Sequence, residues 1–232
     1  HRGDYLDVMH MDIDRDGCDE IIAANSYIST VFSPRRGGAI LELDHKPTGI
    51  NIANVMTRYR EKYHEDMLRD EKLATLIYDK HRKLFMQDHF FSAETGIETF
   101  RRGWHDELGD FIDGEYIPSI SRRWGNLDLT LSREGNIRKG AVILPVRIRK
   151  VVSILKNEPV LSIEYELTNN SYDELQGNFA VEFNINLVYP QDPGITLEIP
   201  DKDIKDASII SSGEETGVSG LKMIDRRDSF EI

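Results

Sequence analysis

Apolar and polar residues alternate strictly in two segments of the second half of the chain. From Leu161 to Leu167 the odd positions are apolar and the even positions are polar, and from Phe179 to Leu187 the odd positions are again apolar. A period of two places alternate side chains on opposite faces of a strand, and strands with one dry and one wet face are typical of antiparallel sheets. Both segments therefore predict half-buried antiparallel strands.

Other short segments are rich in β-branched and aromatic residues and end at turn residues. The full set of predicted strands covers residues 20–24, 27–33, 39–44, 110–112, 116–123, 127–133, 142–148, 151–155, 161–169 and 178–187. Pro34 to Gly38 and Gly135-Asn136 are predicted turns, because Pro, Gly and Asn favour turn geometry. The aromatic stretch 87–104 is predicted to be a loop.

One window has helical spacing instead. The residues on one face of this window, at spacings of three and four, are Leu73, Leu76, Ile77, Lys80 and Leu84. This pattern predicts a helix over residues 66–87. Many strands with one helical insertion predict a mainly β fold, a large antiparallel β-sandwich. Because no internal repeat or low-complexity linker interrupts the chain, we expect residues 1–232 to form a single domain.

Composition limits the class of protein and its partners. The 232 residues are 39% hydrophobic and 30% charged, which is typical of a soluble globular protein. The net charge of -12 disfavours nucleic acid, whose phosphates attract clustered Lys and Arg. No segment has the run of roughly 18 apolar residues that crosses a membrane. We therefore expect neither a nucleic acid nor a membrane as a partner.

The cysteine content and the two ends of the chain bear on its origin. The single cysteine, Cys18, excludes an internal disulfide and fits a reducing compartment, so we expect a cytoplasmic location. The chain begins at His1 without an initiator methionine or a signal-peptide pattern, and at Ile232 it ends in what looks like the start of an apolar strand. These features predict a fragment of a longer protein.

Residues 12–20, Asp-Ile-Asp-Arg-Asp-Gly-Cys-Asp-Glu, form the most informative motif. A hard cation such as Ca²⁺ takes about six to eight oxygen ligands, and alternating carboxylates on a tight turn supply several of them. The expected ligands are the side chains of Asp12, Asp14, Asp16 and Glu20 and the backbone carbonyl of Cys18. Carboxylates at this spacing repel one another without a cation. The motif therefore predicts a calcium site with a structural role.

The alternative is an exposed acidic turn whose carboxylates are solvated, with Gly17 supplying a positive φ. An EF-hand is excluded, because the bidentate Glu that ends an EF-hand loop is replaced by Ala23. The residues after the motif also predict a strand, whereas an EF-hand loop is flanked by helices. The motif is therefore predicted to be a turn between strands.

Two tryptophans are weak candidates for carbohydrate binding. Trp104 and Trp124 lie in loop-rich or strand-edge contexts near Arg and His residues. Indoles beside polar groups recognise sugar faces by stacking combined with a few hydrogen bonds. Ordinary packing in a core or an interface is the alternative.

Asp88-His89 and His105-Asp106-Glu107 are candidates for general acid–base chemistry, because carboxylates can orient a histidine that titrates near neutral pH. Hydrogen-bonded structural histidines are the alternative. Cys18 is a poor candidate nucleophile, because acidic neighbours raise the pKa of a thiol. The sequence contains no GxGxxG, P-loop lysine, GxSxG or HExxH motif. No catalytic residue is therefore predicted.

Two longer segments resemble a known family. His10 to Glu20 and Phe32 to Asp44 are similar to the C-terminal β-sandwich domain of family-57 glycoside hydrolases, the α-amylase/4-α-glucanotransferase type. Shorter segments with the same resemblance are Tyr63-His-Glu65, Asp88-His-Phe90, Glu107-Leu-Gly-Asp-Phe111 and Glu182-Phe-Asn-Ile-Asn186. The similarity extends from about residue 7 to residue 190.

The resemblance implies a galactose-mutarotase-like supersandwich and a parent enzyme that cleaves and rejoins α-1,4-glucan chains by a retaining mechanism with two carboxylates. It places the catalytic residues on an N-terminal (β/α) barrel that this sequence lacks. The chain is thus expected to be non-catalytic, to stabilise that barrel and to help hold glucan. The family domain continues through further strands, so a homo-oligomer formed at an exposed sheet edge is a further expectation.

Two other functions stay open. A stand-alone carbohydrate-binding module would bind maltooligosaccharides through Trp104 or Trp124. An aldose-epimerase-like enzyme would need His89 or His105 to face a Glu across an open concave sheet. The sequence does not distinguish an amylase from a glucanotransferase as the parent enzyme.

Overall fold

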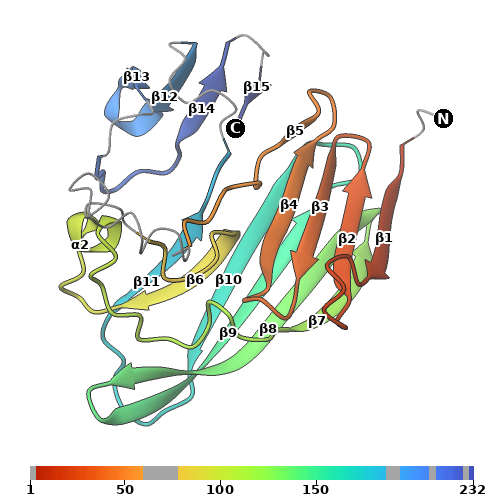
Figure 1. Ribbon diagram of the computed structural model, residues 1–232. Coiled ribbons are helices and arrows are strands. Elements are labelled where there is room, and N and C mark those ends of the chain that lie inside the picture. The colour runs from red at the N-terminus through yellow and green to blue at the C-terminus, as the bar shows by residue number, and fades with distance from the viewer. Residues whose placement is uncertain (1–3, 60–77, 187–193, 209–212, 227–229) are drawn as a thin grey trace, which may run out of the picture. The chain divides into compact units, whose positions relative to one another are not determined.

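The computed structural model describes residues 4–59, 78–186, 194–208, 213–226 and 230–232 (Figure 1). The chain forms two compact units, residues 1–185 and 186–232. The first unit contains two antiparallel sheets, and the second contains a smaller antiparallel sheet. The fold is mainly β, as the alternating sequence pattern predicts. The expectation of a single domain over residues 1–232 stays a prediction.

The first sheet of the larger unit is built largely from the N-terminal third of the chain. Its strands are β1 (Leu6–Met11), β2 (Glu20–Asn25), β3 (Ile28–Ser33), β4 (Ala39–His45), β5 (Ile50–Asn51), β6 (Phe85–Phe91) and β11 (Asn178–Phe183). They lie in the order β1-β2-β3-β4-β6-β11, and β5 pairs with β4. The acidic motif connects β1 to β2, so its prediction as a turn between strands is confirmed.

The second sheet is a meander of longer strands. They are β7 (Ile117–Arg123), β8 (Asn126–Lys139), β9 (Val142–Ile154) and β10 (Leu161–Asn169), in the order β10-β9-β8-β7. The short helix α2 (Ile97–Arg101) lies in the connection from β6 to β7. Figure 1 shows the two sheets of this unit as two layers. The chain thus forms the antiparallel β-sandwich that its sequence predicts.

Alternation along the strands builds the core between these layers. Leu127, Leu129 and Leu131 of β8 are fully buried, as are Ile148, Val152 and Ile154 of β9. Ile21, Phe32 and Ile40 of the first sheet are also fully buried. Each fully buried side chain of this size stabilises the fold by about 1.5–3 kcal/mol.

A buried ion pair joins the two sheets. Nζ of Lys150 on β9 lies 2.8 Å from Oδ2 of Asp88 on β6, and neither side chain is exposed to solvent. Lys150 also donates to the carbonyl of Gly37 at 2.7 Å. Burial lowers the pKa of Lys150 from its ordinary value, and the Asp88 carboxylate opposes that shift. The two layers are therefore linked by charges that have no access to water.

Two tyrosines also donate hydrogen bonds to the Asp88 carboxylate. The hydroxyl of Tyr116 donates to Oδ2 of Asp88 at 2.6 Å, and that of Tyr165 donates to Oδ1 at 3.0 Å. A β-bulge at Met86, whose φ is 71°, shifts the register of β6 against β11. The carbonyl of Met86 accepts a weak hydrogen bond from Lys150 at 3.4 Å. Polar groups from several elements thus converge on one buried pair.

The smaller unit has a sheet of short strands in the order β13-β12-β14-β15. Its elements are β12 (Ile195–Ile199), the 3₁₀ helix η1 (Pro200–Lys202), β13 (Ile204–Ser208), β14 (Lys222–Asp225) and β15 (Phe230–Glu231). Ile195, Ile199 and Met223 are buried in it.

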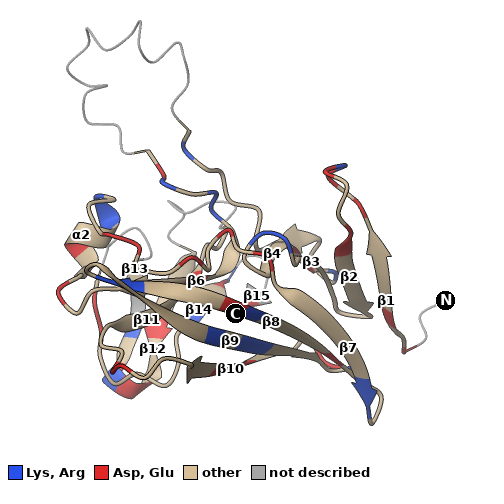
Figure 2. Ribbon diagram, turned by 90° about the horizontal axis from the view of Figure 1, so that it is seen from below, with Lys and Arg blue, Asp and Glu red and all other residues tan. Residues whose placement is uncertain are grey.

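The structure joins the predicted strands 142–148 and 151–155 into the single strand β9. The basic residues between them, Arg149 and Lys150, face opposite sides of the sheet. Arg149 forms an ion pair with Glu166 of β10 at 3.5 Å, and Lys150 forms the buried pair with Asp88. Figure 2 shows this basic segment in blue within β9. Two consecutive charges therefore do not interrupt a strand when each face supplies a partner.

The predicted loop at 87–104 and the predicted helix at 66–87 both need correction. Residues 85–91 form β6, so the helix does not extend to its predicted end, while residues 66–77 lie outside the part of the chain that the structure describes. Residues 86–91 are all buried. The polar pair Asp88-His89 makes this segment look unlike a buried strand in the sequence. In the structure each of these two side chains has polar partners on its own face of the sheet.

The predictions of a turn at Gly135-Asn136 and of a strand at 110–112 are also wrong. Gly135 lies inside β8, and a Cβ at this position would lie 2.6 Å from Cζ of Phe111. Phe111 lies outside the strands and is fully buried, with its ring centroid 5.3 Å from that of Phe90. Gly135 is therefore required for the close approach of Phe111. The turn between β8 and β9 lies instead at Gly140, whose φ is 61°.

None of the helices within the described residues is long and apolar enough to cross a membrane.

Replacing Lys150 tests the role of the buried pair. We expect Lys150→Met to lower the free energy of unfolding by about 3–5 kcal/mol, because Asp88 then stays buried without its cation. Urea denaturation of the purified chain measures this change. The double variant Asp88→Asn/Lys150→Met should lose less than Lys150→Met alone, because neither charge remains. A cost below about 1 kcal/mol for Lys150→Met, or a more unstable double variant, would show that the pair does not stabilise the core.

Candidate functional site

A cavity of about 910 Å³ opens on the larger unit near the end of β11 and around α2. Six of the residues that line it are Arg58, Lys83, Phe100, Trp104, His105 and Glu182. An aromatic wall combined with charged groups is typical of a binding site for a polar ligand. A buried polar cluster forms one side of this cavity.

The register of β6 and β11 positions the centre of the cluster. His89 lies opposite Ala180, and Glu182 lies two residues further along β11, opposite Gln87. Side chains two residues apart on a strand share a face, so His89 and Glu182 are diagonal neighbours on one face of the sheet. Asp88 lies on the other face, where it meets Lys150. The side chain of Asp88 therefore does not orient His89, contrary to one of the acid–base arrangements considered for the sequence.

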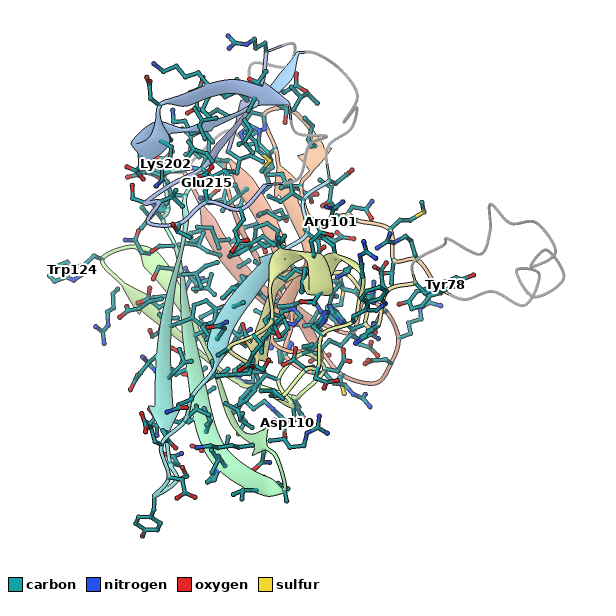
Figure 3. All side chains as sticks on the ribbon, turned by 90° about the vertical axis from the view of Figure 1, so that its left-hand side faces the viewer. Tyr78, Arg101, Asp110, Trp124, Lys202 and Glu215 are labelled. Carbon is teal, nitrogen blue, oxygen red and sulfur yellow. The ribbon has the colours of Figure 1, made fainter. Side chains whose placement is uncertain are left out.

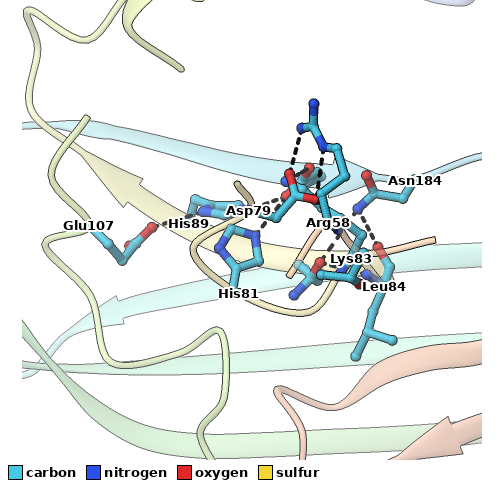
Figure 4. A network of polar contacts seen from close by, with 11 residues as sticks. Arg58, Asp79, His81, Lys83, Leu84, His89, Glu107 and Asn184 are labelled. Atoms are coloured by element: carbon cyan, nitrogen blue, oxygen red, sulfur yellow. Dashed lines mark hydrogen bonds and ion pairs between the residues drawn. The ribbon is translucent and has the colours of Figure 1, made fainter. Parts of the chain in front are cut away.

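Two residues that precede β6 complete the cluster. Nε2 of His81 lies 3.1 Å from Oε2 of Glu182, and Nζ of Lys83 lies 2.6 Å from the other oxygen, Oε1 (Figure 4). Burial opposes the charged form of Glu182, yet its hydrogen bonds with His81, His89 and Lys83 hold the pKa of this carboxyl well below its usual range. Glu182 is thus an anion throughout the neutral pH range.

Both ring nitrogens of His89 face carboxylates. Nε2 lies 3.1 Å from Oε2 of Glu182, and Nδ1 lies 2.8 Å from Oε2 of Glu107. Burial disfavours the imidazolium, but the hydrogen bonds with Glu107 and Glu182 outweigh it and raise the pKa of His89 to about 9. Glu107 is itself held by the backbone N–H of Phe90 at 2.8 Å and of Gly109 at 3.2 Å. The orientation of the His89 ring is therefore fixed.

The aldose-epimerase alternative required His89 or His105 to face a Glu, and His89 does face two of them. The side chain of His89 is only 1% exposed, however, and both of its ring nitrogens are engaged. His105 stacks on Phe100, with ring centroids 4.9 Å apart, and burial, followed by Lys80, lowers the pKa of His105. Both ring nitrogens of His89 are thus occupied, and Nδ1 of His105 is buried.

The two candidate tryptophans lie in different places. Trp104 is 70% exposed on the rim of the cavity, and the guanidinium of Arg102 lies 4.8 Å from its ring centroid. Trp124 is fully exposed at the turn between β7 and β8. Figure 3 shows Trp124 projecting from this hairpin, on the side away from Tyr78 and Arg101 at the cavity. Of the two indoles, only Trp104 is placed to contact a ligand in the cavity.

The acidic motif folds as a compact turn stabilised by its own carboxylates. Asp12 accepts hydrogen bonds from the backbone N–H of Asp16 and of Gly17, both at 3.1 Å. Oε2 of Glu20 accepts from the N–H of Ile13 at 3.0 Å. Oxygens of Asp12, Asp14 and Glu20 all lie within 4.8 Å of one another. These three side chains therefore fit a cation, and Gly17, with a φ of 88°, permits the turn.

Two arginines after β3 partly neutralise this turn. Nη2 of Arg36 lies 2.7 Å from Asp14 and 3.4 Å from Asp16. Nη1 of Arg35 donates to Sγ of Cys18 at 3.0 Å. Asp14 and Asp16 thus both face a guanidinium, and Asp14 in addition has an oxygen close to those of Asp12 and Glu20. The sequence motif gave no sign of these arginine partners, and its prediction as a calcium site stays a prediction.

The polar cluster of the cavity was not predicted as a unit. Glu182 occupies an ordinary polar position in an alternating strand, and His81 and Lys83 precede β6 in a stretch without a motif. Their convergence depends on the pairing of β6 with β11, and His89 and Glu182 are 93 residues apart in the chain. A constellation of this kind has no local signal, because strand pairing rather than spacing creates it.

Comparison with known proteins identifies related chains. The sequence matches the family model described as alpha-amylase/4-alpha-glucanotransferase, C-terminal, over residues 12–74 and 67–229. A 4-alpha-glucanotransferase from Thermococcus kodakarensis is 31% identical over 195 residues, which are 75% of this chain and 28% of that protein. An alpha-amylase from Pyrococcus horikoshii is 31% identical over 217 residues, which are 89% of this chain and 31% of that protein.

A solved structure has the same fold. The 4-alpha-glucanotransferase from Thermococcus litoralis superimposes with a TM-score of 0.69 and is 27% identical, covering 78% of this chain and 27% of that chain. The chain therefore spans less than a third of the length of these relatives.

Proposed function

The chain belongs to the family of C-terminal domains of α-amylases and 4-α-glucanotransferases, and from this premise we propose that it is the non-catalytic domain of an enzyme that acts on α-1,4-glucan chains. The observation that carries this proposal is that the chain matches a family of C-terminal domains and spans less than a third of the length of its relatives. The reaction would then take place on an N-terminal catalytic barrel of the same polypeptide.

Stabilisation of that catalytic barrel is the first part of the proposed role. A β-sandwich with a large buried core is a rigid body against which another domain can pack. The same proposal includes association with the barrel and a homo-oligomer formed at a sheet edge. It also includes a cytoplasmic location, which the single Cys18 supports.

Contact with glucan is the second part. Trp104 offers an exposed indole at the rim of the cavity, and Phe100 adds a second aromatic ring to its wall. Stacking of sugar faces on such rings, combined with hydrogen bonds from charged groups, is how proteins recognise neutral sugars. Trp104 is therefore the residue on which we expect glucan to bind.

A structural calcium ion at the acidic motif is the third part. Asp12, Asp14 and Glu20 supply carboxylate oxygens around a common centre, and the backbone carbonyl of Cys18 is an additional donor in the proposed ligand set. Asp16 completes the motif, and Arg36 competes with the ion for both Asp14 and Asp16. The ion would hold the turn between β1 and β2 and would take no part in chemistry.

The isolated chain should not process glucan. We expect no change in the length distribution of maltoheptaose after prolonged incubation with the folded chain, because the catalytic carboxylates of a retaining enzyme lie elsewhere in the polypeptide. Chromatography of the products measures this, with circular dichroism as the control for folding. Formation of shorter or longer glucans, abolished by heat denaturation, would contradict the non-catalytic role.

Replacing Trp104 tests the glucan contact. Calorimetry with maltooligosaccharides should detect binding to the chain, and Trp104→Ala should weaken it by about tenfold, or about 1.4 kcal/mol. Trp124→Ala is the matched control, since it removes an exposed indole away from the cavity. If no maltooligosaccharide binds, or if Trp124→Ala has the larger effect, the cavity is not the glucan site.

Calcium should raise the melting temperature of the chain, because a ligand that binds only the native state stabilises it. Thermal unfolding with millimolar Ca²⁺ and with EDTA measures the shift. Asp14→Asn should abolish the calcium-dependent shift, whereas Asp173→Asn, at an exposed aspartate between β10 and β11, should keep it. The absence of a shift in the unmodified chain would exclude the site.

A further inference from the structure

The cluster of His81, His89 and Glu182 has the donor atoms of a transition-metal site. Nε2 of each histidine lies 3.1 Å from Oε2 of Glu182, and the three donor atoms all lie within 4.8 Å of one another. In a tetrahedral site with bonds of about 2.0–2.2 Å, neighbouring ligand atoms lie about 3.3–3.6 Å apart. A small adjustment of these side chains would therefore accommodate an ion between them.

We propose that His81, His89 and Glu182 bind a zinc-type divalent cation. Two imidazole nitrogens and one carboxylate oxygen are a donor set that suits zinc, whereas Ca²⁺ takes oxygen ligands almost alone. The ion takes the lone pair of Nε2 on each ring, and any proton on that nitrogen passes to solvent. The proposed ion is distinct from calcium at the acidic motif, both in its ligands and in its position in the fold.

Glu107 is the positioning residue of this site. A histidine that binds a metal through Nε2 commonly donates its Nδ1–H to a carboxylate, which fixes the ring and strengthens the ligand. Nδ1 of His89 lies 2.8 Å from Oε2 of Glu107, and the other oxygen of Glu107 is held by two backbone N–H groups. The second nitrogen of His89 therefore already has the partner that a metal site requires.

The fourth coordination position faces the cavity. His81 and Glu182 both line it, and three protein ligands leave one position of a tetrahedral ion for water or for a ligand in the cavity. The side chains of His81 and Glu182 are only 8% and 13% exposed. The ligands are therefore sheltered, yet the ion has a route of entry.

Lys83 competes with the ion. Its Nζ lies 2.6 Å from Oε1 of Glu182, so it neutralises the same carboxylate that would bind the metal. In the absence of metal, Lys83 and the two histidines form an ion-pair network with Glu182. Removing the ammonium should therefore increase affinity for the metal, whereas a network without a metal function would gain none.

Metal titration of the folded chain, after dialysis against a chelator, tests the proposal. We expect one zinc ion per chain by native mass spectrometry, and Co²⁺ in its place should give the visible absorption of a four-coordinate ion. Millimolar Ca²⁺ should not displace either metal. His81→Gln and Glu182→Gln should weaken binding by more than about 100-fold, because an outer partner alone accounts for about 10–100-fold.

Four further variants distinguish this site from the acidic motif and from an ion-pair network that binds no metal. Glu107→Gln should weaken zinc binding by about 10–100-fold while keeping the stoichiometry. His105→Gln, at a neighbouring buried histidine outside the cluster, and Asp14→Asn, in the acidic motif, should leave zinc affinity unchanged. Lys83→Met should bind zinc more tightly than the unmodified chain, and it stays informative if the ligand variants fail to fold.

The proposal is overturned if neither the unmodified chain nor Lys83→Met binds zinc in a stoichiometric amount. It is also overturned if folded His81→Gln and Glu182→Gln bind zinc as tightly as the unmodified chain. Loss of binding in Asp14→Asn alone would assign the ion to the acidic motif and overturn it equally. None of these results depends on whether glucan binds at Trp104.

Discussion

The buried pair of Asp88 and Lys150 is the interaction on which the rest of the larger unit depends. It links β6 of one sheet to β9 of the other at a position with no exposure to water, and it also draws in Tyr116, Tyr165 and the backbone after β3. A charge left alone there would cost several kcal/mol, so the two sheets must pack in the register that brings the partners together. The pair therefore fixes the position of β6 within the sandwich.

The position of β6 in turn determines where the cavity cluster forms. Asp88 and His89 are consecutive, so their side chains face opposite sides of the sheet. One side holds the buried ion pair, and the other holds His89 against Glu107 and Glu182. The bulge at Met86 shifts the register at the point where β11 presents Glu182. A single strand thus serves the core on one face and the candidate site on the other.

The sequence predicted strands where the pattern has a local period, although the strand predicted at 178–187 ends at Phe183. β10 lies at the predicted 161–169, and the acidic motif is the predicted turn between strands. The sequence could not predict β6, because its polar residues have partners that are distant in the chain, nor the role of Gly135, because the ring of Phe111 approaches it from another segment. The cluster of His81, His89 and Glu182 at the cavity could not be predicted for the same reason. Three of the segments with the family resemblance, 88–90, 107–111 and 182–186, nevertheless contain His89, its partner Glu107, and Glu182.

The division of β6 into a structural face and a metal-binding face can be measured directly. Crystals of the chain grown with zinc, with anomalous diffraction recorded on both sides of the zinc absorption edge, locate the ion without assumptions about its ligands. We expect a single strong peak bonded to Nε2 of His81, Nε2 of His89 and a carboxylate oxygen of Glu182 at about 2.0–2.2 Å, with Asp88 and Lys150 still paired on the opposite face. A peak at the acidic motif alone, or no ordered zinc in the cavity cluster, would contradict it.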